Sequence, residues 1–339
     1  MMKKWSRFLI CISVLLCMPG MVFAQDGKAG TAATLEEVVV TATRQEEAIS
    51  SVPANISVIT EEEIQNSPAR DVPDLLRTEA GVHVSDISGN RRSYSVDLRG
   101  FGETASMNTL VLVDGRKINS PDLSATDWTL IPVDRIERIE IIRGGRGSVL
   151  YGDNAAGGAI NIITKQGKGF DASAEVAGGS YDTGKANAQI SGSHKDLSYS
   201  LTGSYLTSDG YRDNSDTRAK DAGVNLDYFA SDRVKLYLSS GYHEDKTGLP
   251  GGLKESDFAA GASRKDSINP NDFADVEDYY IKAGPEVYFL NNSMLKFDFS
   301  YRNRESLYFS SFSTGTFEGD TEIETVAVSP QIVLDEGIF

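Results

Sequence analysis

The stretch Ile131–Lys165, IPVDRIERIEIIRGGRGSVLYGDNAAGGAINIITK, decides the fold of the N-terminal half of this chain. Two apolar runs of β type, Arg135–Ile142 and Ala159–Ile163, flank a segment that holds six glycines from Gly144 to Gly158. Glycine at this density lets the backbone adopt positive φ angles and approach other backbone closely. The stretch therefore predicts a tight strand–turn–strand module inside a compact domain.

Neither of the common glycine-rich phosphate motifs is present in this stretch. Gly147 and Gly152 have the spacing of a P-loop, but Asp153 stands where that motif needs lysine. No G-x-G-x-x-G follows either strand, which excludes the dinucleotide fingerprint. Arg143 and Arg146 are consequently not expected to bind a nucleotide cofactor.

The first 24 residues have the pattern of a secretory signal peptide. A basic start precedes an apolar core, Phe8–Met18, which is too short to span a bilayer, and cleavage is expected after Ala24. The only two cysteines, Cys11 and Cys17, lie inside this segment. The mature chain is therefore expected to have neither disulfides nor cysteine chemistry.

The charge of the chain fits a protein that is exported to the cell envelope. The sequence has 33 basic and 49 acidic residues, a net charge of −16 at neutral pH. Nucleic-acid binding needs a basic face, so this balance argues against a nucleic-acid partner.

A short β-prone segment follows the signal peptide. Residues 25–34 are small and polar and predict a disordered arm. Leu35–Arg44, LEEVVVTATR, comes next and is suited to adding a strand to the sheet edge of another protein. The alternative is that this segment forms the first strand of the following domain.

The chain up to Gln166 then predicts a compact α+β domain. Two short helices are expected, Glu61–Gln65 with a capping box of Thr60 and Glu63, and Asp71–Thr78. The further expected strands, some of which are joined by polar loops, are Ile56–Ile59, Val82–Val84, Tyr94–Leu98, Thr109–Val113 and Arg116–Ile118.

After Gly169 the sequence alternates strictly between apolar and polar residues. Leu197–Thr207, Arg233–Tyr242 and Leu295–Arg302 each place apolar and aromatic side chains on one face and polar or charged ones on the other. Their length is near the 9–11 residues of a tilted membrane strand. A soluble β-sandwich alternates in the same way. The signal peptide, the lack of cysteine and the many tyrosines favour a membrane β-barrel.

Turn lengths and strand number refine this expectation. Three turns are short: Tyr181–Gly184, Lys195–Asp196 and Ala230–Asp232. Two loops are long: Ser208–Asp221 and Glu244–Val276. Short turns on one side and long loops on the other are typical of outer-membrane barrels. About eight strands are visible. A closed barrel of eight strands has no room for a domain in its interior. Either the domain lies outside a small barrel or the barrel is truncated, and we favour truncation.

Several of these segments together resemble one family, the TonB-dependent outer-membrane receptors. EVVVTA (Glu37–Ala42) resembles a TonB box, and LRGFG (Leu98–Gly102), VLVDGR (Val111–Arg116) and the Ile131–Lys165 stretch resemble signature segments of the plug domain. The resemblance covers Leu35–Lys165 in order. It implies a 22-stranded barrel closed by an N-terminal α+β plug, with the barrel truncated here to about eight strands.

The resemblance also implies a division of the chain and a function. We expect a signal peptide (1–24), a disordered arm (25–34), the TonB box region (35–44), the plug (45–166) and the first part of the barrel (170–339). Such receptors import a scarce metal chelate into the periplasm with energy transmitted by TonB. A ferric siderophore is the first candidate, and cobalamin or haem is the alternative. A passive porin or adhesin, or a non-functional truncated remnant, is the alternative of another class.

The implied partners are TonB with its inner-membrane complex, the chelate and outer-membrane lipid of a Gram-negative bacterium. No enzymatic residue set, metal triad or cofactor is expected. The carboxylate-rich loop Ser208–Asp221 could bind calcium, but it lacks EF-hand spacing, and a solvated loop is favoured.

Three groups of site residues follow from the resemblance. The box residues expected to pair with TonB are Glu37, Val38, Val39, Val40, Thr41 and Ala42. The residues expected to bind the ligand from two polar plug loops are Asn90, Arg91, Arg92, Asn119, Asp122 and Trp128. The residues expected to pair with barrel-wall carboxylates are Arg99, Arg143 and Arg146. Arg91 and Arg92 could attract an anionic ferric complex, although solvated arginines or plug–barrel ion pairs explain them equally well.

Overall fold

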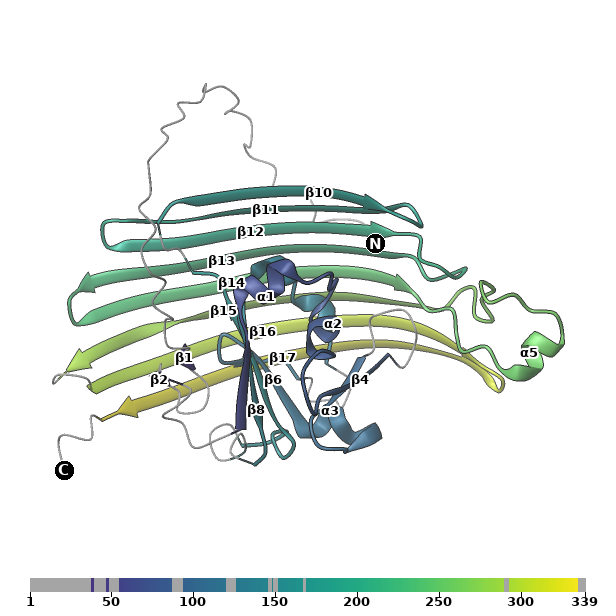
Figure 1. Cartoon of the computed structure of the whole chain (residues 1–339), viewed down its shortest axis with the longest axis horizontal. Coiled ribbons are helices and arrows are strands. Elements are labelled where there is room, and N and C mark those ends of the chain that lie inside the picture. Colours follow the sequence, from purple (N-terminus) through teal and green to yellow (C-terminus); the bar gives the residue numbers. More distant parts are fainter. Residues whose placement is uncertain are drawn as a thin grey trace, which may run out of the picture. The chain divides into compact units, whose positions relative to one another are not determined.

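The computed structural model of the chain describes residues 38–39, 47–48, 55–86, 94–119, 126–145, 148, 152–166, 169–289 and 293–334. Residues from Glu37 onward belong to one compact unit. Along the chain this unit holds first an α+β domain and then a long antiparallel sheet, named here the barrel sheet (Figure 1). In the described ranges, no helix has both the length and the apolar character needed to cross a membrane.

The α+β domain is built on a five-stranded sheet in the order β3-β8-β9-β6-β7. Only the β6–β9 pair is parallel. The strands of this sheet are β3 (Asn55–Ile59), β6 (Thr109–Val113), β7 (Arg116–Lys117), β8 (Ile136–Arg143) and β9 (Gly158–Thr164). A separate two-stranded sheet pairs β4 (His83–Asp86) with β5 (Tyr94–Asp97). The expected strands are therefore present, with ends that differ by one or two residues.

Short helices connect these strands. The α helices are α1 (Glu61–Asn66), α2 (Val72–Leu76) and α3 (Ala105–Asn108), and the 3-10 turns are η2 (Gly102–Thr104), η3 (Trp128–Leu130) and η4 (Val133–Arg135). The predicted capping box is present, because the Thr60 hydroxyl accepts from the Glu63 N–H and the Glu63 carboxylate accepts from the Thr60 N–H. The Asp71 carboxylate caps α2 by accepting from the Asp74 N–H.

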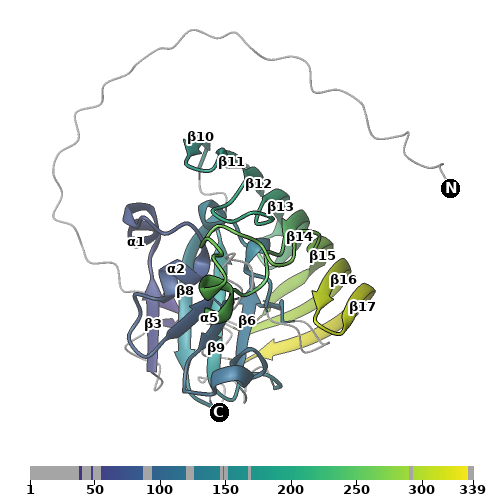
Figure 2. The same ribbon diagram turned by 90° about the vertical axis from the view of Figure 1, so that its right-hand side faces the viewer.

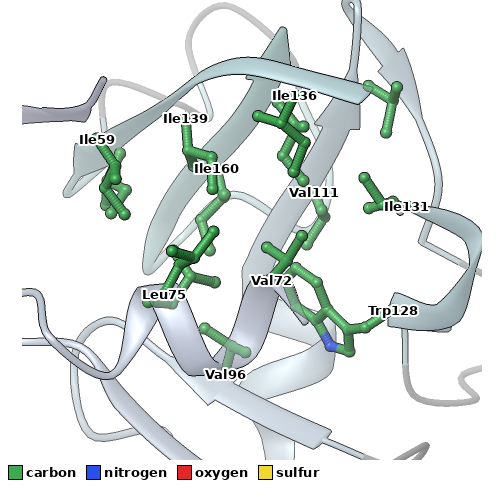
Figure 3. Packing of buried hydrophobic residues seen from close by; sticks show 14 of the residues in the cluster. Ile59, Val72, Leu75, Val96, Val111, Trp128, Ile131, Ile136, Ile139 and Ile160 are labelled. Carbon is green, nitrogen blue, oxygen red and sulfur yellow. The ribbon is translucent and has the colours of Figure 1, made fainter. Parts of the chain in front are cut away.

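Aliphatic side chains from the sheet and from α2 form the core of the domain (Figure 3). Val72 and Leu75 of α2 lie against a layer of isoleucines from β8 and β9, including Ile139 and Ile160. Burial of each such side chain contributes roughly 1.5–3 kcal/mol. The apolar side chains of α2, Val72, Leu75 and Leu76, are thus buried in this core.

The glycine-rich segment brings two strands together as the sequence predicts. Gly158 at the start of β9 has φ of +143°, and a Cβ there would collide with the carbonyl oxygen of Ile142 in β8. The Gly144 N–H donates to the Gly157 carbonyl at 3.0 Å, which closes the turn between the strands. Glycine is therefore required here for close backbone approach.

The barrel sheet contains eight strands paired antiparallel in chain order, which confirms the predicted number. They follow an arc when viewed along their length (Figure 2). The strands are β10 (Asp171–Gly179), β11 (Thr183–His194), β12 (Leu197–Ser208), β13 (Thr217–Ser231), β14 (Val234–Gly248), β15 (Phe273–Phe289), β16 (Ser293–Phe312) and β17 (Gly315–Val333). A short helix, α5 (Glu255–Ala259), lies in the connection between β14 and β15.

The two faces of the barrel sheet differ as the alternation predicts. Apolar and aromatic side chains are exposed on one face: Leu197, Leu201, Tyr205, Tyr228, Leu236, Tyr242, Tyr279, Ile281, Phe297, Phe299, Val326 and Val328. Phe299 is 50% and Val328 is 65% exposed. A β-sandwich would cover such a face with a second sheet, whereas a membrane barrel turns it toward lipid. The exposed apolar face therefore indicates a membrane barrel and not a β-sandwich.

The expected alternation of turn lengths is only partly correct. The turn at Tyr181 lies on the same side of the sheet as the long loops, because the Asp209 N–H donates to the Tyr181 carbonyl. The tyrosine ring also packs edge to face on Tyr211, with the ring centroids 5.7 Å apart. The spacing of the strands in the sequence predicts the length of each turn. The end of the sheet on which a turn lies follows from the number of strands that precede it.

Candidate functional site

The α+β domain contacts the inner, polar face of the barrel sheet, and this contact is the candidate functional site. Within the described residues, four cationic side chains of the barrel sheet contact oxygen atoms of the domain. These residues, called here the barrel cations, are Lys185 of β11, Lys282 of β15, and Arg302 and Arg304 of β16.

Arg302 is the most enclosed of these contacts. Its guanidinium donates to both carboxylate oxygens of Asp278 on the neighbouring strand, with Nε 2.9 and 3.1 Å from the oxygens. Nη1 also donates to the backbone carbonyl of Ile118 at 3.3 Å. Because both charged groups are buried, breaking one partner would leave an uncompensated charge. Arg302 therefore fixes the end of the β6–β7 hairpin against β16.

The other barrel cations hold neighbouring parts of the domain. Arg304 Nη2 lies 3.3 Å from a carboxylate oxygen of Asp127, which precedes η3. Lys282 Nζ donates to the carbonyl of Asp114 at 2.9 Å. Lys185 Nζ lies 2.8 Å from the carboxylate of Asp134. These contacts join cations of the barrel to acceptors of the domain.

This polarity is opposite to the expected one, which paired arginines of the plug with barrel carboxylates. Arg143 lies within the domain instead, 3.6 Å from Glu79, and donates to the Ser57 hydroxyl at 3.0 Å. A Cβ on Gly144 would lie 3.1 Å from Nη2 of Arg99, so Arg99 packs on the glycine-rich turn. Arg146 lies outside the described residues. The signature segment that contains Arg143 did not predict its partner, because Glu79 lies far away in the sequence.

The signature segment Leu98–Gly102 is organised by the carboxylate of Asp97. Its oxygens accept from the backbone N–H groups of Arg99 at 2.9 Å, Gly100 at 2.8 Å and Gly102 at 2.7 Å. Burial acts to raise the pKa of Asp97, but these hydrogen bonds to the charged form outweigh burial and hold the pKa below its ordinary value. The carboxylate thereby fixes the turn that places Arg99.

Two of the expected ligand residues, Trp128 and Asn119, belong to the core of the domain, and their role in ligand binding stays a prediction. Trp128 is only 2% exposed and packs beside Val72 and Val111 (Figure 3). Asn119 is 6% exposed, and its side-chain amide accepts from the Val111 N–H at 2.7 Å and donates to the Thr109 carbonyl at 3.0 Å. A polar residue in a loop pattern cannot be distinguished by sequence from a buried residue that satisfies a strand backbone.

The remaining ligand candidates lie outside the described residues, and their role in ligand binding stays a prediction: Asn90, Arg91, Arg92 and Asp122. In the expected TonB box, the structure describes only β1 (Val38–Val39), which pairs antiparallel with β2 (Glu47–Ala48). The other box residues, Glu37, Val40, Thr41 and Ala42, also lie outside the described residues.

The carboxylate-rich loop between β12 and β13 is fastened to the loop before β15. Arg212 donates to the carbonyls of Gly251 at 2.5 Å and Asp266 at 2.8 Å. The side-chain amide of Asn214 donates to the carbonyls of Asn269 at 2.6 Å and Asp272 at 2.8 Å. In the part of the chain that the structure describes, no group of three or more His, Cys, Asp or Glu side chains is arranged to hold a metal ion.

An α+β domain held against the polar face of a curved antiparallel sheet, whose other face is apolar and exposed, defines a β-barrel protein of the outer membrane with a plug domain. Residues 48–159 match the family described as TonB-dependent Receptor Plug Domain. The chain belongs to the TonB-dependent receptor family. The α+β domain is its plug.

Named relatives agree with this family. Over 167 residues the chain is 41% identical to the vitamin B12 transporter BtuB of Photobacterium profundum, covering 49% of this chain and 26% of that protein. It is 34% identical over 222 residues to the ferric enterobactin receptor of Pseudomonas aeruginosa, covering 60% of this chain and 28% of that protein. The chain thus spans about a quarter of the length of these curated relatives.

Solved structures share the fold. The unliganded ferric citrate transporter FecA matches with a TM-score of 0.74 at 20% identity, over 82% of this chain and 44% of that one. The ferric yersiniabactin uptake receptor FyuA from Yersinia pestis matches with a TM-score of 0.68 at 17% identity, over 83% of this chain and 46% of that one. At this identity the likeness concerns the fold alone.

Proposed function

We propose that the protein takes part in TonB-dependent import of a metal chelate across the outer membrane of a Gram-negative bacterium. The observation that carries the proposal is the plug held against the polar face of the barrel sheet by Arg302, which binds both Asp278 and the Ile118 carbonyl. A passive pore or an adhesin has no need of a plug held by buried polar contacts. Only an active transporter needs one that can be moved.

Two classes of chelate are proposed as substrates, a ferric siderophore first and cobalamin second. The relatives support both, since one is named a vitamin B12 transporter and another a ferric enterobactin receptor. We assign no enzymatic activity to the protein, because the family consists of receptors and transporters and the chemistry proposed here is non-covalent binding.

The proposed energy-transducing partner is TonB, which would pair with the box at Glu37–Ala42. The β1–β2 pairing supports this role, because it shows that Val38 and Val39 adopt the extended conformation that strand addition needs. Export through the signal peptide of residues 1–24 and residence in the outer membrane complete the proposal.

A proline in the box tests the proposal by separating uptake from binding. Val39→Pro removes a backbone donor and fixes φ, so pairing with TonB should fail. We expect cells expressing this variant from the protein's own gene to lose chelate uptake while surface binding of the chelate is retained. Ala33→Pro, which lies before the box, is the matched control and should transport normally. Undiminished uptake by the Val39→Pro variant would exclude this segment as the TonB contact.

A further inference from the structure

Two plug arginines, Arg116 of β7 and Arg135 of η4, meet the barrel sheet without a salt bridge to any carboxylate in the described ranges. The strand register places Gly223, Gly241 and Tyr280 side by side on β13, β14 and β15. We propose that this row, called here the arginine seat, is a docking surface that positions the plug by accepting the two guanidinium groups. The proposal rests on the proposed function only in taking the α+β domain to be a plug.

The first half of the arginine seat is a gap in the side chains at Gly223. A Cβ at this position would lie 2.6 Å from Cζ of Arg135, would contact its Nη2 more closely still, and would lie 2.8 Å from Oγ1 of Thr202. Real Cβ atoms do not approach other atoms so closely. The Arg135 guanidinium therefore lies against bare strand backbone, and a Cβ at Gly223 would force it to shift from this position.

The second half is an aromatic surface supported by another glycine. A Cβ at Gly241 would lie 2.5 Å from Cε1 of Tyr280, so the ring lies across the glycine backbone. Cζ of Arg116 lies 3.7 Å from the centroid of this ring. A guanidinium stacked on an aromatic face at this distance makes a favourable cation–π contact, and burial strengthens it. Tyr280 is only 9% exposed.

The two halves form one continuous surface. A cavity of about 20 Å³ lies beside it and is lined by residues that include Arg116, Arg135, Tyr280 and Thr164. A space of this size holds about one water molecule. A small gap thus lies beside the contacts that the two arginines make with the seat.

The arginine seat and the barrel cations hold the plug by different physical means. The barrel cations use ion pairs and hydrogen bonds to plug oxygens, for example Lys185 with Asp134 at 2.8 Å. The seat uses shape and an aromatic face. A Cβ added at Gly223 should therefore displace the Arg135 guanidinium and weaken docking of the plug, even though every ion pair of the barrel cations is left intact.

Cross-linking between plug and barrel tests the seat without ligand or TonB. Thr164 of the plug accepts from the side-chain amide of Asn225 on β13 at 3.1 Å, two residues from Gly223. The pair Thr164→Cys and Asn225→Cys can be joined by a short bifunctional thiol reagent, because both natural cysteines lie in the expected signal peptide. The rate of cross-linking in isolated outer membranes measures how often the plug is docked.

We expect Gly223→Ala to slow this cross-linking several-fold. The matched control is Gly203→Ala on the neighbouring strand β12, where a Cβ would find its nearest neighbour at an ordinary 3.8 Å. The control should cross-link at the parent rate. An unchanged rate in Gly223→Ala would overturn the proposal, and so would an equal loss in Gly203→Ala, because the effect would then not belong to the seat.

A double-mutant cycle decides whether Arg135 is the group that the glycine accommodates. If it is, Gly223→Ala should have little effect in a background that already carries Arg135→Ala, because the clash with the guanidinium is gone and the Thr202 hydroxyl can rotate away from the new Cβ. Additive losses from the two substitutions would contradict the proposal. Arg135→Ala leaves the barrel sheet unchanged, so it should slow cross-linking even if Gly223→Ala prevents the barrel from folding. A parent-like rate for this variant alone would also contradict the proposal.

Discussion

At the scale of single residues, buried polar groups determine the local structure of the plug. The Asp97 carboxylate accepts three backbone N–H groups, and the Asn119 amide satisfies both the N–H of Val111 and the carbonyl of Thr109. Asp97 directly precedes the signature segment Leu98–Gly102, and Asn119 lies in a loop that was predicted to bind the ligand. Their positions follow from the sequence patterns, but the role of Asn119 as a partner of the strand backbone follows only from the fold.

Asp97→Asn should destabilise the plug and change its acid dependence. The substitution removes the charge and one of the two acceptor oxygens, so we expect a loss of about 1–3 kcal/mol in the free energy of unfolding at neutral pH. Because the folded-state pKa of Asp97 is lowered, its contribution is present above the ordinary value of 3.8 and is lost as the pH falls through the lowered pKa.

The measurement is urea denaturation of the detergent-solubilised protein from pH 7 downward. The parent and Asp97→Asn should differ at pH 7 and should converge below pH 3.8. A constant difference across this range would show that the carboxylate charge is not the stabilising feature.

Asn119→Ala should lower stability without a ligand-specific effect. Removing its amide leaves buried backbone groups of the β6 strand unsatisfied, which costs about 1–3 kcal/mol for each group. Denaturation of this variant should shift to lower urea concentration, while Glu62→Ala on the exposed face of α1 should not. A variant of parent stability with weakened chelate binding would instead support the predicted ligand role of Asn119.

At the scale of elements, the sequence predicts strand identity better than strand length. The expected strand Leu295–Arg302 is part of β16, which runs from Ser293 to Phe312. Alternation marks only the part of a strand with one apolar face. Beyond the lipid both faces can be polar, so the pattern ends before the strand does.

The fastened loops make a separate prediction at this scale. Arg212 and Asn214 join the β12–β13 connection to the connection that carries α5. Asn214→Ala should free the second loop and accelerate chymotrypsin cleavage after the exposed Phe258 several-fold. Lys254→Gln, in the same loop but outside the fastening, serves as the control. Equal cleavage rates in the parent and Asn214→Ala would show that the loop is held by other contacts.

At the scale of the whole molecule, the sequence predicted the two parts but not how they meet. The plug segments and the alternating strands are local patterns, and both are present in the structure. The barrel cations contact residues far away in the chain, as Arg302 contacts the carbonyl of Ile118. Backbone acceptors have no sequence signal at all. The sequence did not predict the arginine seat either, because the key feature of the seat is the absence of a side chain at Gly223.

The most direct test of active import is TonB-dependent uptake in cells that lack their own receptors. The protein, expressed from its own gene, is supplied with radiolabelled cobalamin or with iron bound to each of a panel of siderophores. Accumulation is then compared with and without TonB. The account predicts accumulation of at least one chelate that requires TonB. Accumulation of no chelate, or the same accumulation without TonB, would contradict it.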